Sequence, residues 1–258
     1  MKKVRLQAHR GVSTDFPENT MSAFWGAVEQ GYDVIELDPA VTKDKQFIIL
    51  HDHTLNRTGR FADGTPLPEQ KKIADTTLEE LAAYEFGSWF SPAFVGEKLP
   101  RLEDVLKLSE KTGIPLKIDN KFEHFAEPDL TAFLNILEDS HAHLAFTCAR
   151  AGNLLMLSER FPEAELHYDG AIDDETLALL SGSVGPDRLT VWVPYKNKDT
   201  SWVTVEFLNE DLAQKIKQYG ALGVWILSTE EEYQKAVALG ADIIETTGSL
   251  KPRKGVEK

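Results

Sequence analysis

Short apolar runs alternate with longer segments along most of the chain. The short runs have the length and residue types of buried strands, whereas the longer segments repeat apolar residues every three or four positions, as amphipathic helices do. Strands that alternate with helices predict a parallel sheet covered by helices, and a chain of 258 residues suits an α/β fold of the (β/α)8 TIM-barrel type. Nine runs have strand character: 4–8, 33–38, 47–50, 115–120, 145–149, 164–169, 188–195, 222–228 and 241–246.

Helix-like segments fall between most of these runs. One begins at Asn19 or Thr20, either of which can cap its first turn, and it ends before Gly31. Another covers about 102–111. The segments 209–220 and 230–240 are the clearest, because each combines an amphipathic pattern with a terminal glycine.

Two features depart from a regular barrel. The chain has nine strand-like runs, whereas the barrel needs eight strands. We expect one of the runs between 165 and 195 to lie outside the barrel. The link between Asp38 and Phe47 is too short for a helical crossover, so the residues after Asp38 are expected to return in extended form.

Residues 53–100 interrupt the alternation with many glycines, prolines and aromatic residues and one short helical segment. We expect them to form a small cap subdomain inserted after the third strand, because insertions at the carboxyl ends of barrel strands form active-site loops. A self-packed surface lobe is the alternative. Residues 1–250 are thus expected to form a single TIM-barrel domain that carries the 53–100 cap, followed by a frayed polar tail, 251–258.

Polar clusters stand at the ends of four strand-like runs. Because strand side chains alternate between faces, residues two apart, such as Glu36 and Asp38, point the same way. If the strands are parallel neighbours, the clusters converge on one rim of the barrel. The residues that would meet there are His9, Arg10, Glu36, Asp38, His51, Asp119 and Lys121.

These residue types suit a divalent cation and a phosphate held together. Carboxylates such as Glu36 and Asp38 bind hard cations such as Mg2+ or Ca2+, although an isolated pair is usually one solvated and one ion-paired acid. Histidines titrate near neutral pH and can act as general acid and base, although each alone is more often structural. Arg10 and Lys121 can bind phosphate oxygens, or can instead neutralise the acids.

Charge and composition exclude several classes of protein. The chain has 28 Lys and Arg and 42 Asp and Glu, a net charge of −14, which disfavours nucleic acid and anionic membrane surfaces as partners. Local positive charge must therefore hold any phosphate. We find neither the apolar stretch of a signal peptide nor an apolar run long enough to span a bilayer, so we expect a cytoplasmic protein with no stable membrane association, either a monomer or a homo-oligomer.

Other chemical interpretations remain open from the residues alone. The single cysteine, Cys148, lies in an apolar run and is more typical of a core residue than of a nucleophile. His51 and His53 form an H-x-H pair of the kind that supplies zinc ligands in amidohydrolase-type barrels, although that motif usually ends the first strand. A non-catalytic binding protein on an enzyme barrel is a further alternative.

Taken together, the motifs resemble those of the glycerophosphodiester phosphodiesterase family. The matching stretches occur in the family's order over nearly the whole chain. They are AHRG (8–11), PENT with Ala23-Phe24 (17–24), IELD (35–38), TKD (42–44), LHDHTLNRT (50–58), LPRLEDVL (99–106), IDNK (118–121), Trp225 and GADIIETT (240–247).

The resemblance implies a (β/α)8 barrel with a small inserted subdomain and metal-dependent hydrolysis of a small-molecule glycerophosphodiester to sn-glycerol 3-phosphate and an alcohol. One divalent cation, Mg2+ or Ca2+ and in some cases Mn2+, is implied. Phospholipases and related phosphodiesterases on the same barrel are the alternative. The implied roles are metal binding by Glu36, Asp38 and Asp119, general acid and base catalysis by His9 and His51, and phosphate binding by Arg10 and Lys121. Apart from the resemblance, Trp225 could pack against the alcohol part of a substrate if it points to the barrel mouth, although a tryptophan in a strand-like run is more often a core residue.

Some positions depart from the family pattern. The family usually has Glu at the position of Asp119, and the missing methylene retracts the carboxylate by about 1.5 Å, against metal–ligand tolerances of about 0.2 Å. Asn120 stands where an apolar residue is common, and Ile226-Leu227-Ser228 replaces the frequent Thr-Val-Asn after Trp225. These changes leave the reaction class intact but bear on the choice of metal and of substrate alcohol.

Overall fold

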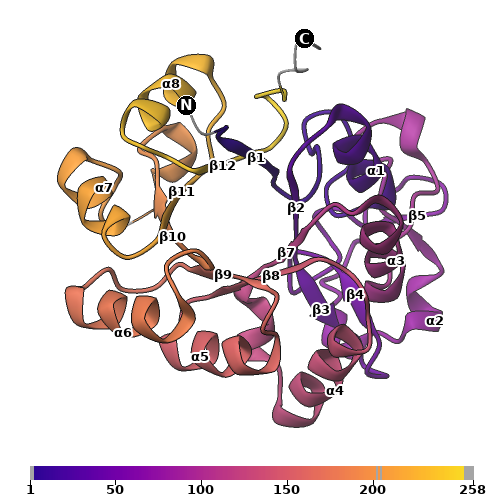
Figure 1. Ribbon diagram of the computed structural model, residues 1–258. Coiled ribbons are helices and arrows are strands. Elements are labelled where there is room, and N and C mark those ends of the chain that lie inside the picture. Colours follow the sequence, from indigo (N-terminus) through magenta and orange to yellow (C-terminus); the bar gives the residue numbers. More distant parts are fainter. Residues whose placement is uncertain (1–2, 202, 204, 253–258) are drawn as a thin grey trace.

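The computed structural model describes residues 3–201, 203 and 205–252, and eight parallel strands of this part of the chain form a closed barrel (Figure 1). β1 pairs with both β2 and β12, which closes the sheet. Around the barrel the order is β1, β12, β11, β10, β9, β8, β7 and β2. The strands are β1 (Arg5–Ala8), β2 (Val34–Leu37), β7 (Leu116–Ile118), β8 (Leu144–Cys148), β9 (Glu165–Tyr168), β10 (Leu189–Pro194), β11 (Ala221–Trp225) and β12 (Ile243–Thr246).

Helices surround the barrel in the ring that Figure 1 shows. Thr20 caps the first of them by accepting a hydrogen bond from the Ala23 N–H, and Gly31 ends it in the left-handed conformation, with φ of 79°. Asn209 caps α7 in the same way as Thr20 caps α1. The helices are α1 (Met21–Gln30), α3 (Leu102–Thr112), α4 (Glu127–Glu138), α5 (Ala151–Arg160), α6 (Asp174–Val184), α7 (Glu210–Lys217) and α8 (Glu230–Ala238).

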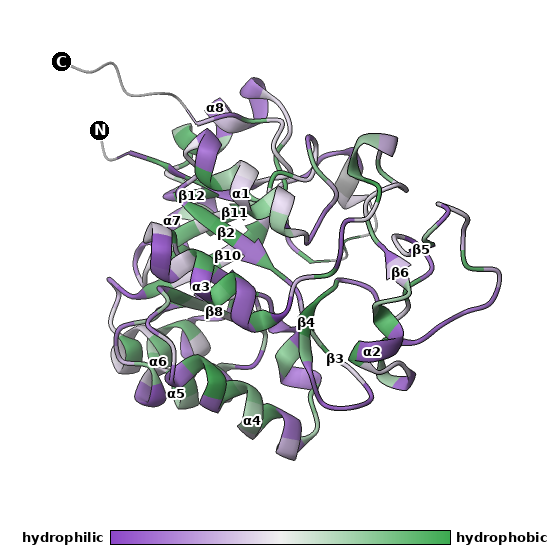
Figure 2. Ribbon diagram, turned by 90° about the vertical axis from the view of Figure 1, so that its right-hand side faces the viewer, coloured by the Kyte–Doolittle hydropathy of each residue, from purple (hydrophilic) through white to green (hydrophobic). Residues whose placement is uncertain are grey.

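The chain between β2 and α3 forms small elements outside the barrel. β3 (Pro39–Val41) and β4 (Phe47–Ile49) make an antiparallel hairpin, and β5 (Arg60–Phe61) pairs with β6 (Tyr84–Glu85). The helix α2 (Leu78–Leu81) lies between them in the sequence. In Figure 2 these elements lie beside the barrel, away from the N-terminus. Short 3-10 turns complete the structure: Ile73–Asp75, Pro92–Phe94, Asn120–His124 and Lys198–Thr200.

The barrel prediction is confirmed, but the surplus strand was placed wrongly. Both runs between 165 and 195 are barrel strands, β9 and β10, whereas the run 47–50 forms β4 in the hairpin. A parallel pairing needs a long crossover, and the few residues between β3 and β4 permit only an antiparallel return. The expectation that the chain returns in extended form after Asp38 is confirmed. The 53–100 insertion therefore follows the hairpin rather than a third barrel strand.

The barrel interior is unusually polar. Outward-facing residues such as Leu6 and Ile35 are buried in the large apolar cluster that also includes Phe24 of α1. The inward face instead carries charged and polar side chains that the strand alternation brings to the same interior. The buried interior residues include Gln7, Glu36, Lys117, His167, Trp192 and Glu245.

The first and last strands of the chain lie side by side, because β1 pairs with β12 (Figure 1). Lys251, near the last described residue, forms an ion pair with Asp15, with 2.6 Å between Nζ and Oδ2. The expected polar tail 251–258 is therefore ordered at its first residue, and 253–258 lie outside the described residues.

Candidate active site

Three carboxylates meet where β2 and β7 end. Glu36 lies in β2, Asp38 follows that strand directly, and Asp119 follows β7. The two strands are paired, and the Asp119 N–H donates to the Leu37 carbonyl at 3.0 Å, which sets the ends of the two strands level. One oxygen from each carboxylate lies within 4.8 Å of the others. The sequence predicted this convergence, and the structure shows it.

Two basic side chains hold Asp38. Lys121 Nζ lies 2.7 Å from one oxygen of Asp38 and 3.0 Å from Oδ2 of Asp119, and Arg10 Nε lies 3.2 Å from the other oxygen of Asp38. Burial alone would raise the pKa of Asp38, but Lys121 and Arg10 more than offset it and hold this pKa well below its usual range. Asp38 is therefore ionised at neutral pH.

Glu36 has a different environment. It is 2% exposed and accepts a hydrogen bond from the Arg10 backbone N–H at 2.8 Å, but no Lys or Arg side chain of the described residues pairs with it. Burial, Asp38 and Glu245 raise its pKa well above the usual value. A divalent cation would replace that proton and relieve the repulsion, so the donor set fits a hard metal ion.

Asn19 adds a further oxygen to this region. Its side-chain N–H donates to Asp38 at 2.7 Å, while its amide oxygen is buried without a hydrogen-bond partner among the described residues. The backbone of Asn19 is left-handed, with φ of 55°, as is that of Arg10, with φ of 57°. Such conformations cost about 1 kcal/mol or more and persist where the surrounding structure fixes them, often at functional sites.

His9 stands directly after β1, above the barrel interior. Its Nε2 lies 4.0 Å from an oxygen of Glu36 and 4.0 Å from an oxygen of Glu245, while Nδ1 is buried without a partner among the described residues. Burial lowers the pKa of His9 to about 4, although Glu245 acts in the opposite direction. The imidazole is therefore neutral at pH 7 and can accept a proton.

His51 reaches the site from the hairpin rather than from a barrel strand, which corrects the sequence-based placement. The preceding residue, Leu50, donates its N–H to the Asp38 carbonyl at 2.9 Å, and the His51 charge is one of the influences that lower the pKa of Asp38. Nδ1 of His51 lies 2.7 Å from an Asp52 oxygen. Asp52 is in turn held by Arg57, so this histidine has a fixed orientation.

Arg57 is a residue that the sequence did not single out. It donates to both oxygens of Glu18, at 2.9 and 2.7 Å, and Arg10 donates to Glu18 at 2.9 Å. This chain of ion pairs joins the 53–100 insertion to the phosphate-binding candidate Arg10. The stretch LNRT, which contains Arg57, was part of the family resemblance and carried the signal.

A second missed group lies beneath His9. Lys117 Nζ donates to Glu245 at 3.2 Å, and Gln7 donates to the same carboxylate oxygen. Burial would raise the pKa of Glu245, but Lys117 and His9 lower it overall. Gln7 and Lys117 stand two residues before His9 and Asp119, so the strand period places them on the same face. This two-residue spacing could have predicted that Gln7 and Lys117 face the barrel interior.

Trp225 ends β11 and is half-buried. It lines a pocket of about 200 Å3 at the barrel mouth, together with Asp169, Trp192, Pro194 and Glu206. Trp225 thus lies at the mouth rather than in the core, and its contact with the substrate stays a prediction.

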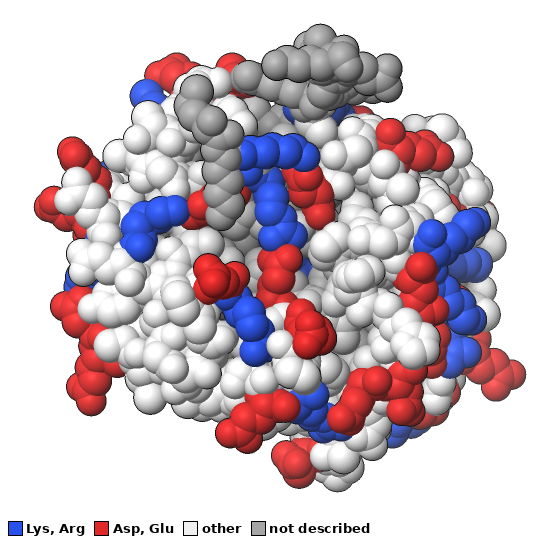
Figure 3. All heavy atoms as spheres, viewed as in Figure 1, with Lys and Arg blue, Asp and Glu red and all other residues white. Residues whose placement is uncertain are grey.

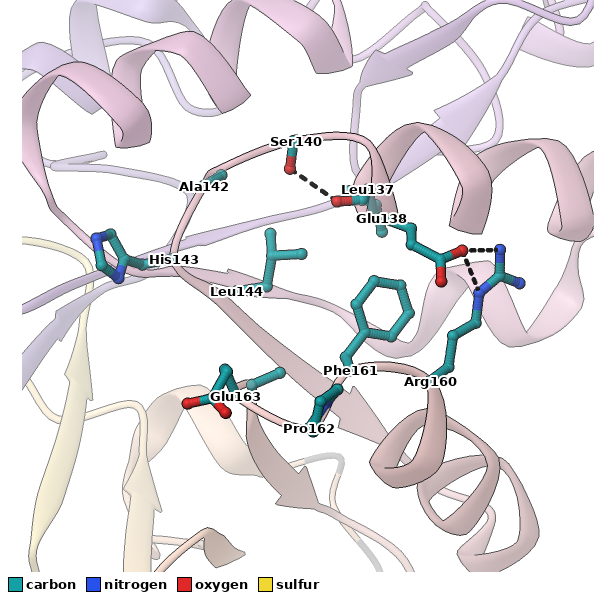
Figure 4. Close-up of a pocket in the computed structure, with 11 residues that line it drawn as sticks. Leu137, Glu138, Ser140, Ala142, His143, Leu144, Arg160, Phe161, Pro162 and Glu163 are labelled. Atoms are coloured by element: carbon teal, nitrogen blue, oxygen red, sulfur yellow. Dashed lines mark hydrogen bonds and ion pairs between the residues drawn. The ribbon is translucent and has the colours of Figure 1, made fainter.

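A second pocket, of about 300 Å3, lies at the opposite end of the barrel (Figure 4). It is lined by Leu144, which begins β8, and by Ala164, which precedes β9, and the Arg160–Glu138 ion pair crosses its side. None of the clustered carboxylates or histidines of the mouth belongs to it. The first pocket lies at the same end of the strands as the clustered carboxylates, whereas the second lies at the other end.

The other interpretations from the sequence find less support. His53 is exposed, and the acidic trio is the only group of three or more potential metal ligands among the described residues, so the H-x-H pair is not part of such a group. Cys148 is fully buried, and burial raises the pKa of its thiol, as expected of a core residue. Figure 3 shows acidic and basic side chains interspersed on one face, without a continuous basic area there.

No helix in the described part of the chain combines the length and apolar character needed to cross a bilayer.

Comparison with known proteins places this site in a family context. A sequence model described as the glycerophosphoryl diester phosphodiesterase family matches residues 9–225. A glycerophosphodiester phosphodiesterase of Bacillus altitudinis is 30% identical over 261 residues, which cover 94% of each chain. A putative glycerophosphodiester phosphodiesterase of Bacillus subtilis, YhdW, is 46% identical over 104 residues, so this chain spans only 40% of that relative's length in the match.

Solved structures share the fold. A phosphodiesterase of Oleispira antarctica, in complex with the product sn-glycerol-3-phosphate, has a TM-score of 0.75 at 22% identity, covering 95% of this chain and 93% of that one. A glycerophosphodiester phosphodiesterase of Thermotoga maritima has a TM-score of 0.64 at 23% identity, covering 96% of both chains. At these identities the likeness concerns the barrel and not the substrate.

Proposed function

Because the chain belongs to the glycerophosphoryl diester phosphodiesterase family, we propose that it hydrolyses glycerophosphodiesters to sn-glycerol 3-phosphate and an alcohol. The observation that carries this proposal is the meeting of Glu36, Asp38 and Asp119 with His9 and two basic side chains at the carboxyl end of the barrel. Relatives named as glycerophosphodiester phosphodiesterases support it, as does the product bound to the Oleispira antarctica protein.

Glu36, Asp38 and Asp119 would hold one divalent cation, Mg2+ or Ca2+, with Mn2+ as the third candidate. When bound, such an ion neutralises charge that develops on the phosphoryl oxygens. The shorter side chain of Asp119 would favour a larger cation or a bridging water.

Arg10 and Lys121 would bind the phosphate. Both lie against Asp38, which fixes their positions while leaving further N–H groups to donate. Because the protein carries a net charge of −14, these local cations have to overcome long-range repulsion of an anionic substrate.

His9 and His51 would move the protons. Neutral His9 suits the general base, which takes the proton from the attacking hydroxyl, either of water or of the substrate's own glycerol. His51, held by Asp52, suits the general acid, which gives its proton to the alcohol oxygen as the P–O bond breaks. If the glycerol hydroxyl attacks, a cyclic phosphate forms, and water then opens it with the two roles reversed.

The 53–100 insertion would act as a cap within a single domain spanning 1–250. The Arg57–Glu18–Arg10 chain of ion pairs supports this role, because it ties the insertion to the phosphate-binding residues. Trp225 would pack against the substrate at the mouth of the barrel. The partner is a small molecule, and neither nucleic acid nor a membrane is part of the proposal.

Release of glycerol 3-phosphate from glycerophosphocholine and glycerophosphoethanolamine tests the proposal. The assay uses metal-stripped protein with Mg2+, Ca2+, Mn2+ or no addition, beside the His9→Ala variant. We expect turnover that depends on the metal and is lost in His9→Ala. Absence of turnover with every metal would overturn the proposed activity.

A further inference from the structure

The pocket beside Trp225 combines aromatic walls with two acidic side chains. Asp169 follows β9 on the inward face, Glu206 belongs to the loop between β10 and α7, and Trp192 lies in β10. The pocket adjoins the catalytic region through Lys117. Glu36 and Asp119 both raise the pKa of this lysine, and its Nζ lies 4.2 Å from the centroid of the Trp192 ring that lines the pocket. A group attached to a phosphate at the acidic trio would therefore extend toward this pocket.

Asp169 has a carboxylate without a matching cation. Its backbone N–H donates to the Cys148 carbonyl at 2.9 Å, but its side chain makes no hydrogen bond or ion pair with any described residue. The side chain is exposed to the pocket, yet surrounding protein raises its pKa to about 7 through burial, with Asp119 and Glu245 adding to the rise and Lys117 opposing it. A positively charged group on a ligand would therefore stabilise the ionised form of this carboxylate.

The other charges near the pocket leave it negative. Lys117 is paired with Glu245 at 3.2 Å, so it offsets the charge of Asp169 only in part. Glu206 accepts a hydrogen bond from the Asn209 side chain at 2.8 Å but forms no ion pair among the described residues. Gly223 contributes to the shape, because a Cβ there would lie 2.5 Å from the Trp192 ring, and the ring can occupy its place only against a glycine.

We propose that this pocket receives the alcohol group of the substrate and that Asp169 and Glu206 select alcohols that carry an ammonium or quaternary ammonium group. This inference rests on the proposed function and names the substrate class within it. Carboxylates attract such a cation directly, and the tryptophan walls suit its alkyl groups. An alcohol that carries a carboxylate or phosphate would meet like charges and be disfavoured.

The test compares two substrates that differ in charge but not in shape. Glycerophosphocholine is compared with the analogue in which 3,3-dimethylbutanol replaces choline, so that carbon stands in place of the charged nitrogen. The ratio of their kcat/KM values is measured for the wild type, Asp169→Asn and Glu206→Gln. Glu231→Gln, an exposed change of the same charge on α8, serves as the control.

We expect the wild type to favour the charged substrate by roughly tenfold, the value of one modest charge-assisted contact. Asp169→Asn should reduce this ratio several-fold, Glu206→Gln should reduce it less, and Glu231→Gln should leave it unchanged. Equal turnover of both substrates by the wild type, or an unchanged ratio in a folded Asp169→Asn and in Glu206→Gln, would overturn the inference while leaving the phosphodiesterase activity in place.

A binding measurement separates this inference from the proposed function. Choline and 3,3-dimethylbutanol are titrated separately into wild-type protein with Mg2+ or Ca2+ present, and heat of binding is recorded. Preferential binding of choline that weakens in Asp169→Asn supports the pocket even if no substrate is turned over, in which case only the proposed reaction fails. Equal binding, or no binding, of the two alcohols contradicts the cation preference.

Discussion

The two sides of the barrel mouth differ in how their acidic side chains are paired with basic ones. On the side of β1, β2 and β7, the acids Asp38 and Asp119 are matched by Arg10 and Lys121 within about 3 Å. On the side of β9, β10 and β11, Asp169 forms no ion pair with a described residue and lines a pocket together with Trp192 and Trp225. Under the proposed function, the first side would bind the phosphate together with a metal ion, and the second side would bind a group of positive charge. A phosphodiester with a cationic alcohol has both features at neighbouring positions.

The largest expected effect concerns the first side. Replacement of His9 by alanine removes the proposed base, and kcat should fall by about two to four orders of magnitude. His53→Ala, an exposed change three residues after Leu50, should retain nearly full activity. Steady-state kinetics on both variants measures kcat and compares it with that of the wild type. Severe loss in His53→Ala would instead favour the zinc-hydrolase interpretation of His51 and His53.

The next effect concerns the interior beneath both sides. Glu245→Leu leaves Lys117 buried without its anion, which typically costs about 3–5 kcal/mol of folding free energy. The double variant with Lys117→Met should recover most of that loss, because neither charge then remains. Urea unfolding of the two single variants and the double variant measures the coupling. Additive losses would show that the two residues are energetically independent, contrary to their 3.2 Å contact.

The acidic trio should bind metal in a pH-dependent way. Glu36 has a raised pKa, so it keeps a proton to higher pH than a free glutamate and must lose it to act as a ligand. Added Ca2+ or Mg2+ should therefore raise Tm more at pH 8 than at pH 5. Glu36→Gln should abolish the increase at both values. A metal-induced shift that is larger at pH 5 would contradict the assignment.

The smallest effect concerns Asp169. Its pKa is about 7 in the folded protein and lower in the unfolded chain, so between these values the folded state holds more protons and stability falls as pH rises. Relative to the wild type, Asp169→Asn should gain about one to three degrees in Tm at pH 8. It should gain nothing at pH 3, where both states are protonated. Because the side chain is exposed to the pocket, solvent screening keeps the effect small.

The sequence predicted most of the first side of the mouth. The strand period placed Glu36 and Asp38 on one face, and strand ends that follow one another in a parallel sheet brought Asp119 to them. His51 was expected at the site, and the structure places it near Asp38, but it follows a hairpin strand rather than a barrel strand. The apolar run 47–50 has the same pattern in a hairpin as in a barrel. Its proximity to Asp38 depends on an antiparallel return that local pattern does not specify.

The interior charges and the second side were not predicted. Lys117 and Glu245 lie 128 positions apart in the sequence, and their pairing follows from closure of the barrel. A single charged residue in an apolar run normally indicates the solvent face of a strand. In the sequence, Asp169 is only the polar residue that ends the strand-like run 164–169. Its proposed role became visible only when the structure placed it in a pocket.

The polar interior described above also has a practical consequence for engineering. In this barrel the charged residues at the centre lie directly beneath the proposed catalytic side chains. Replacing them with aliphatic side chains to raise heat resistance is therefore expected to lower the proposed activity. The layer between the strands and the surrounding helices, where Leu6, Phe24 and Ile35 pack, is free of that conflict. Stabilising substitutions should be sought there first.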